Sequence, residues 1–195
     1  MGDARQVGSP GLNTPTTIGS LAQFQGILMN LGTASGWSMD NVASWAKFAG
    51  SNADLADTGS RLLYQGNELA SAYLATVAPD HGPRVHPVFP ALALGELWLF
   101  IVDMSPKYRD LIRNQRFALH TLPTAQGGEE FYIRGLAELV ADADEKSQIL
   151  TGIDTNQGAM DFEALFRCGL KSVLYTRWDH WGTAESWPNY EKWQA

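Results

Sequence analysis

The sequence predicts a mainly β protein, in which five or six antiparallel strands close into a barrel-like domain with two or three small helices. Three observations favour this fold class. Short apolar segments alternate with tight turns from residue 61 onwards. Gly135 interrupts one of the longest segments, as expected where a strand bends sharply to close a barrel. The glycine-rich dinucleotide turn, the P-loop and the Gly-x-Ser-x-Gly elbow of common α/β folds are all missing from the sequence.

Residues 1–60 show no strand pattern, and we expect them to lie outside the barrel domain, which should span residues 61–195. Residues 1–20 are rich in Gly, Pro, Ser and Thr, a composition that predicts a flexible tail. Residues 21–31 and 39–48 each have the spacing of a short helix, whose apolar face would pack on the main domain or on a partner. A linker is expected from residue 53 to residue 60.

The first predicted strands form a hairpin. Residues 72–77 and 84–89 flank the turn Pro-Asp-His-Gly-Pro, whose members favour fixed or positive φ. Residues 96–102 are almost continuously apolar, which is typical of a strand covered on both faces. Residues 116–122 and 129–140 then predict a second antiparallel pair, with a bulge or bend at the glycine.

The C-terminal third contains three further predicted elements. Residues 142–150 have an acidic first turn and predict a surface helix. Residues 162–166 predict a short helical piece, and residues 171–178 predict the last strand.

A predicted helix that begins after the strand 96–102 carries the first candidate site. Ser105 is a good N-cap and Pro106 suits the first helical position, so Lys107, Arg109 and Arg113 are expected on or near the positive end of the helix. Cations are normally disfavoured there, because free N–H groups already present positive charge. Three of them make sense if an anion, most plausibly a phosphate, binds at this point. The alternative is a solvated basic helix face that nearby aspartates partly neutralise.

The strand 84–89 carries the second candidate site. Alternation predicts that Arg84, His86 and Val88 share one face. Pro87 belongs at a sheet edge or where the ladder is open, which leaves backbone groups for a ligand. His86 would then hydrogen-bond a bound molecule, although an exposed or structurally paired histidine is the alternative.

Four tryptophans stand out in the C-terminal tail, namely Trp178, Trp181, Trp187 and Trp193. Large aromatic side chains with a polar edge suit a subunit interface or the wall of a pocket for a flat ring. Equally, they would cover the open end of the barrel.

Composition limits the possible partners of this chain of 195 residues. Its net charge of −7 argues against a broad surface for nucleic acid or an anionic membrane. The single cysteine, Cys168, is expected to be a small core residue, and it fits a reducing cytoplasm. The four histidines lack the spacing of a metal site, so no metal is expected. Without a secretory signal or an apolar span, the protein is expected in the cytoplasm.

Five segments occur in one order and strand context: Ala-Tyr-Leu-Ala-Thr-Val at 72–77, Gly-Pro-Arg-Val-His-Pro-Val at 82–88, Ser-Pro-Lys at 105–107, Arg-Phe-Ala-Leu at 116–119 and Phe-Tyr-Ile-Arg-Gly-Leu-Ala-Glu at 131–138. Taken together they resemble the pyridoxamine 5′-phosphate oxidase-like family of flavin-binding split barrels, across roughly residues 61–180. The resemblance implies a six-stranded antiparallel split barrel that works as a homodimer, with a flavin-type cofactor in each of two interface clefts.

The resemblance also implies roles for particular residues. Ser105 and Lys107 would hold the cofactor phosphate. The ring system would lie along the strand that carries His86, Pro87 and Val88, and the backbone at Ile101 and Val102 would approach it. Further cofactor contacts are expected from Arg84, Arg109 and Arg113, and from Trp187 in the aromatic tail.

Two departures from the family pattern argue against vitamin B6 oxidation. The second strand lacks the lysine of true pyridoxamine phosphate oxidases, and their C-terminal arginine motif is not evident in residues 186–190. We therefore expect an FMN-dependent oxidoreductase that transfers hydride to or from a small organic substrate, with no side chain named as catalytic. One alternative keeps the fold and uses a deazaflavin coenzyme, whose longer acidic tail would need Arg84 and Arg109. Another is a non-catalytic protein that binds flavin or haem.

Overall fold

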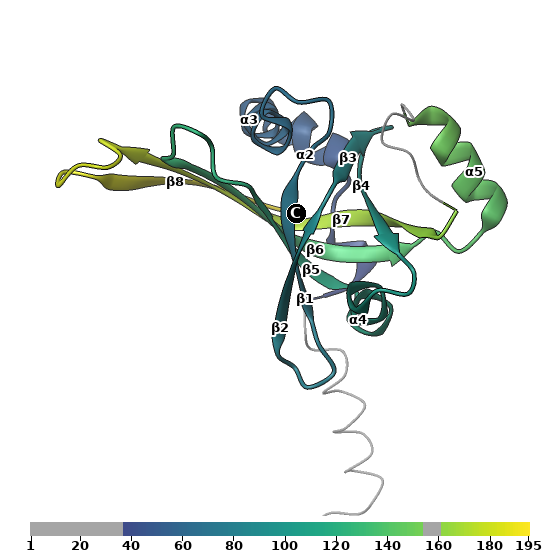
Figure 1. The fold of residues 1–195 in the computed structure, drawn as a ribbon. Coiled ribbons are helices and arrows are strands. Elements are labelled where there is room, and N and C mark those ends of the chain that lie inside the picture. The colour runs from purple at the N-terminus through teal and green to yellow at the C-terminus, as the bar shows by residue number, and fades with distance from the viewer. Residues whose placement is uncertain (1–36, 154–160) are drawn as a thin grey trace, which may run out of the picture. The chain divides into compact units, whose positions relative to one another are not determined.

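The structure is a computed structural model that describes residues 37–153 and 161–195. Eight antiparallel strands form one sheet in the order β2-β1-β5-β6-β7-β4-β3, and β8 pairs with β7. The sheet curls into a half-barrel, and β7 and β8 extend from it as a long arm (Figure 1). The strands are β1 (Ala72–Val77), β2 (Pro83–Val88), β3 (Pro90–Ala93), β4 (Glu96–Val102), β5 (Arg116–Thr121), β6 (Glu129–Leu139), β7 (Glu163–Asp179) and β8 (Trp187–Gln194). The helices are η1 (Met39–Asn41), α2 (Trp45–Ser51), α3 (Ala53–Tyr64), α4 (Pro106–Asn114) and α5 (Ala143–Gly152).

Both faces of the curled sheet are covered at β4 and β7. The larger core lies inside the curl, where α2 and α3 bring Phe48 and Leu55 against strand residues such as Phe131. A second core lies on the other side, where Ile149 of α5 packs with Trp98 and other buried residues. This double burial explains why residues 96–102 are apolar at almost every position.

The bend expected at Gly135 is present. The pairing of β6 with β7 changes register between Arg134 and Gly135. A methyl group at Gly135 would lie 1.9 Å from the carbonyl oxygen of Gly169, so only glycine allows the two strands to approach this closely.

The predicted fold class is confirmed, as are the hairpin of β1 and β2, the two-faced strand β4 and the helix that Ser105 caps. The sheet has two strands more than the six expected, because β3 and β8 each add one. Neither short β3 nor β8, with its many exposed side chains, shows the apolar pattern that predicts a strand.

Three predicted segments are wrong. Residues 53–60 form most of α3 rather than a linker, because Asn52 caps the helix by accepting a hydrogen bond from the Leu55 N–H (3.1 Å). Residues 39–48 form η1, an extended segment and the start of α2, not one helix. Residues 162–166 are not helical: all but the first belong to β7, where Leu165 and Phe166 are both buried on opposite faces.

The expected domain boundary after residue 60 falls inside α3. Residues 37–195 form one compact unit, to which α2 and α3 belong. The flexible tail expected at residues 1–20 and the helix expected at 21–31 lie outside the described residues. Among the helices described, none has the length and apolar character needed to cross a membrane.

Candidate functional site

The start of α4 places a cation at the positive end of the helix dipole. Ser105 caps the helix as predicted, since its Oγ accepts a hydrogen bond from the Tyr108 N–H (3.3 Å), and Pro106 follows in the first turn. Lys107 is partly buried in the same turn, and this burial lowers its pKa, while the nearby carboxylate of Glu163 acts in the opposite direction. A bound anion would offset the cost of keeping this partly buried ammonium charged.

β2 turns Arg84, His86 and Val88 toward the interior, as the alternation predicted, and leaves Pro87 exposed on the other face. Within the described residues, the Nε2 atom of His86 is buried and has no hydrogen-bond partner. Burial is the main cause that lowers the pKa of His86, followed by the charges of Lys107 and Arg84, with Asp110 opposing them. A neutral imidazole with a buried, unsatisfied nitrogen therefore lies close to two cations.

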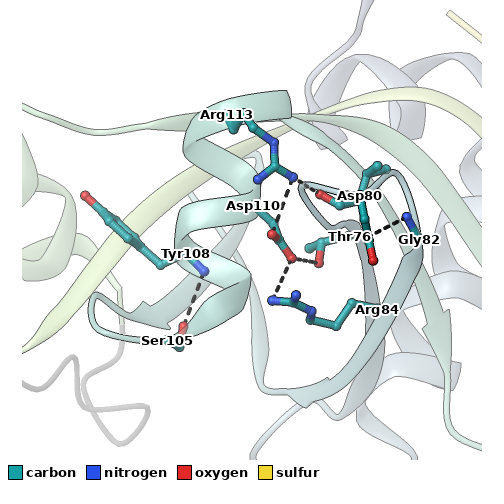
Figure 2. A network of polar contacts seen from close by, with 9 residues as sticks. Thr76, Asp80, Gly82, Arg84, Ser105, Tyr108, Asp110 and Arg113 are labelled. Atoms are coloured by element: carbon teal, nitrogen blue, oxygen red, sulfur yellow. Dashed lines mark hydrogen bonds and ion pairs between the residues drawn. The ribbon is translucent and has the colours of Figure 1, made fainter.

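A buried carboxylate organises the arginines around α4 (Figure 2). Asp110 is 1% exposed, and its Oδ2 accepts a hydrogen bond from the Thr76 hydroxyl (2.9 Å) and lies 3.3 Å from Arg84 Nη1. Its Oδ1 lies 3.5 Å from Arg113 Nη2, and the same Nη2 also donates to the Val77 carbonyl. The cluster joins β1, β2 and α4.

The expectation that Arg113 lies near the positive end of α4 is wrong. Arg113 is in the last turn, where a cation is favoured by the helix dipole, and its guanidinium bonds to Asp110 and to β1. Arg109 is exposed on the same helix. Of the three predicted helix cations, Lys107 is the one that reaches the neighbourhood of His86.

The remaining predicted residues fall into two groups. Ile101 and Val102 end β4 next to the site, where the Val102 carbonyl accepts a hydrogen bond from the Ser105 N–H (3.0 Å), although the Ile101 side chain is fully buried. Trp187 lies on β8 and is 70% exposed. Its backbone partner is Asp179 in the arm, so one copy of the chain does not bring Trp187 to the start of α4 (Figure 1).

Sequence reasoning missed an aromatic cleft in the arm. It has a volume of about 230 Å³, and its walls are mostly apolar. Trp178 and Trp181 meet edge to face there with ring centroids 5.7 Å apart, and the buried Trp178 Nε1 has no hydrogen-bond partner among the described residues. The density of tryptophans signalled an aromatic wall, but the sequence does not show which of them turn inward. The cleft is lined by His120, Pro123, Gly127, Gly128, Glu129, Glu130, Trp178 and Trp181.

Comparison with known proteins identifies the fold. No family model matches the chain, and no curated protein matches it. Among solved structures, a Clostridium acetobutylicum protein related to general stress protein 26 of B. subtilis, of the pyridoxinephosphate oxidase family, is 14% identical, with a TM-score of 0.50 over 76% of this chain and 95% of that chain. The described part of the chain therefore has the split-barrel fold of the pyridoxamine 5′-phosphate oxidase-like proteins.

Two further similar structures are those of haem proteins. A heme binding protein from Mycobacterium smegmatis is 15% identical, with a TM-score of 0.49 over 68% of this chain and 55% of that chain. HutZ, the heme storage protein from Vibrio cholerae, is 16% identical, with a TM-score of 0.46 over 59% of this chain and 89% of that chain. At such identities the likeness concerns the fold alone.

Proposed function

We propose that this protein is a cytoplasmic, homodimeric oxidoreductase that binds FMN at the start of α4 and transfers hydride to or from a small organic substrate. The observation that carries the proposal is the buried, unpartnered Nε2 of His86, which lies near the charges of Lys107 and Arg84. Buried polar atoms in folded proteins nearly always have a partner, so this atom is best explained by a ligand.

The residues present fit the phosphate of FMN. Lys107 and Arg84 supply positive charge, and Lys107 lies at the positive end of the α4 dipole. The Ser105 Oγ accepts a hydrogen bond from the helix, and its O–H hydrogen can donate to a phosphate oxygen. An ammonium, a guanidinium and a hydroxyl would thus be the donors to one phosphate group.

The residues also fit a flat, polar ring beside the phosphate. His86 presents its nitrogen from the inward face of β2, and Val102 ends the neighbouring β4 at the same turn as Ser105. When bound, a flavin accepts and donates a hydride, so the protein has only to orient it and exclude water. We assign no side chain as acid or base.

We propose that a second copy of the chain completes the site. The two clefts described in residues 37–153 and 161–195 lie away from Lys107, whereas a cofactor of this size is normally buried over most of its surface. The outer face of β1 and β2 exposes Tyr73 and Val85 and is suited to another protein surface. The aromatic cleft of Trp178 and Trp181 is our candidate for the second wall.

A second candidate is a haem-binding protein without catalysis. A neutral imidazole is a common axial ligand of haem iron, and burial favours the neutral form of His86. An absorption spectrum of the purified protein separates the two proposals. Purified protein that absorbs as a flavin and releases FMN on denaturation, as found by mass spectrometry, would support the first, whereas a Soret band would support the second. Release of a deazaflavin coenzyme would keep the fold and the hydride chemistry but change the cofactor.

Replacing Lys107 by Ala tests the phosphate assignment. We expect FMN binding to weaken by about 1.5–3 kcal/mol, the scale of a charge-assisted hydrogen bond, and riboflavin binding to change little because riboflavin has no phosphate. Fluorescence titration of both ligands measures the difference. Lys47→Ala, at an exposed lysine of α2, is the matched control and should leave both affinities unchanged. Equal FMN affinity in Lys107→Ala and the wild type would refute the assignment.

A further inference from the structure

We infer that Asp110 is a positioning residue: its buried carboxylate holds Arg84 toward the anion site and keeps Arg113 out of it. The inference rests on the proposed phosphate site and assigns the two arginines different tasks. Asp110 is itself too deeply buried to touch a ligand, so it can act on ligand binding only through its charge or through a neighbouring side chain.

The bonding pattern separates the two arginines. Arg113 binds two acceptors at once, the carboxylate of Asp110 and the Val77 carbonyl, so its guanidinium is committed to joining α4 to β1. Arg84 meets Asp110 through Nη1, and a guanidinium carries five N–H donors. Its side chain is one third exposed, so donors remain for an anion in front of it.

The position of Arg84 connects this cluster to the rest of the site. Arg84 and His86 lie on the same face of β2, and their backbone partners on β1 are Thr76 and Leu74. Thr76 is the residue whose hydroxyl holds Oδ2 of Asp110. The Asp110 carboxylate is thus held by Thr76 of β1 and contacts the Arg84 guanidinium of β2, on the side of α4 that faces these strands (Figure 2).

Removal of the carboxylate charge distinguishes positioning from simple electrostatics. If Asp110 acted only as a negative charge near the site, Asp110→Asn would bind an anion more tightly, because repulsion is lost. If Asp110 positions Arg84, the variant holds the guanidinium less firmly and binds the anion less tightly, because the ion pair with the carboxylate becomes a weaker neutral hydrogen bond. The asparagine oxygen can still accept the Thr76 hydrogen bond, so the cluster is expected to stay folded.

The experiment is a titration of FMN and riboflavin against the full-length wild type, Asp110→Asn, Arg84→Met and the double variant. We expect Asp110→Asn to raise the Kd for FMN by about tenfold, the value of one charge-assisted hydrogen bond, and to leave the Kd for riboflavin unchanged. In the Arg84→Met background the Asp110→Asn substitution should have no further effect, because the group through which it acts is missing. Tighter FMN binding by Asp110→Asn, or an unchanged effect in the double variant, would overturn the inference.

If Asp110→Asn does not fold, a second pair of variants tests whether Arg84 and Arg113 have the different tasks that the inference assigns to them. Arg84→Met should lose the preference for FMN over riboflavin, whereas Arg113→Lys, which keeps the charge but not the two-armed contact, should melt at a lower temperature and keep the preference. The reverse pattern would overturn the inference. A wild type that binds FMN no better than riboflavin would instead refute the proposed phosphate site, which is the separate claim.

Discussion

At the scale of single residues, the site combines groups that are costly to bury. Lys107 is partly buried and His86 carries a buried nitrogen, and the pKa of each is lowered by that burial. An apolar side chain at either position could be buried without this cost. Perturbed titratable groups of this kind cluster at functional sites, and this combination supports the proposal of a ligand that pairs with both groups.

The lowered pKa of His86 predicts a pH-dependent stability for the ligand-free protein. As the pH falls below about 6.5, the unfolded chain takes up the proton first, so the free energy of unfolding should fall until the pH passes the lower pKa of the folded protein. Above this window the contribution is fully retained. Urea unfolding at about pH 8 and about pH 5 should therefore show a larger loss for the wild type than for His86→Gln.

Lys107→Met provides the control for this prediction. The charge of Lys107 is one cause of the lowered pKa, so this variant should lose less stability between the two pH values than the wild type does. Identical losses in the wild type and in His86→Gln would show that His86 titrates alike in the folded and unfolded chains.

At the scale of elements, the long antiparallel pairing of β6 with β7 sets the shape of the sheet. On one edge β7 pairs with β4 through its first part and with β8 through its second half, while on the other edge β6 pairs with residues 166–177. The register shift at Gly135 lies at the middle of this long pairing. It bends the sheet around the core while its outer end continues into the arm (Figure 1).

Gly135→Ala should destabilise the protein strongly. The new methyl group would meet the Gly169 carbonyl oxygen at 1.9 Å and the Phe117 ring at 2.9 Å, so we expect a loss of at least the ~1–3 kcal/mol that overpacking causes. Gly50→Ala is the matched control, because a methyl group there has no neighbour within 4 Å and should stabilise α2 by about 0.5–1 kcal/mol. Thermal unfolding followed by circular dichroism measures both. Similar melting temperatures for the two variants would contradict the role given to Gly135.

At the scale of the whole molecule, apolar side chains on the outer face of β1 and β2 are exposed, because none of the described residues covers them. Tyr73 is 44% exposed and Val85 is 61% exposed, and alternation places them on the face opposite His86. Phe89, just beyond β2, is also exposed. A soluble protein rarely leaves such side chains together without a partner, which supports the proposal that a second copy binds here.

Val85→Glu should therefore shift the protein toward a monomer. A carboxylate at the centre of an apolar interface is costly to bury, and loss of the dimer should weaken FMN binding because the site would lose its second wall. Light scattering coupled to size-exclusion chromatography measures the mass, and titration of the same sample measures the affinity. Val85→Thr, similar in shape and uncharged, should remain a dimer. If Val85→Glu is a dimer with wild-type FMN affinity, the interface lies elsewhere.

The sequence by itself determined the features that depend on neighbours along the chain. The turn residues between β1 and β2 set that hairpin, Ser105 and Pro106 set the start of α4, and Gly135 marked the bend. It also predicted that Lys107 lies at the start of a helix and that His86 shares one face of a strand with Arg84, because N-caps and strand alternation are local rules.

The tertiary structure decided what depends on partners distant in sequence. The sequence of residues 162–166 predicts a helix. In the structure this segment enters a strand, because one face packs in the inner core and the other packs in the core that includes α5. The charge pattern of the sequence does not distinguish Arg109 from Arg113. In the structure Arg113 bonds to Val77 and Asp110, because β1 lies beside α4. Likewise, the sequence grouped Trp178 and Trp187 among four tail tryptophans of one kind, whereas in the structure Trp178 lines the aromatic cleft and Trp187 is exposed. The strand at 163–166, the contacts of Arg113 and the exposure of each tryptophan all depend on long-range packing and strand register, which no short segment of the sequence determines.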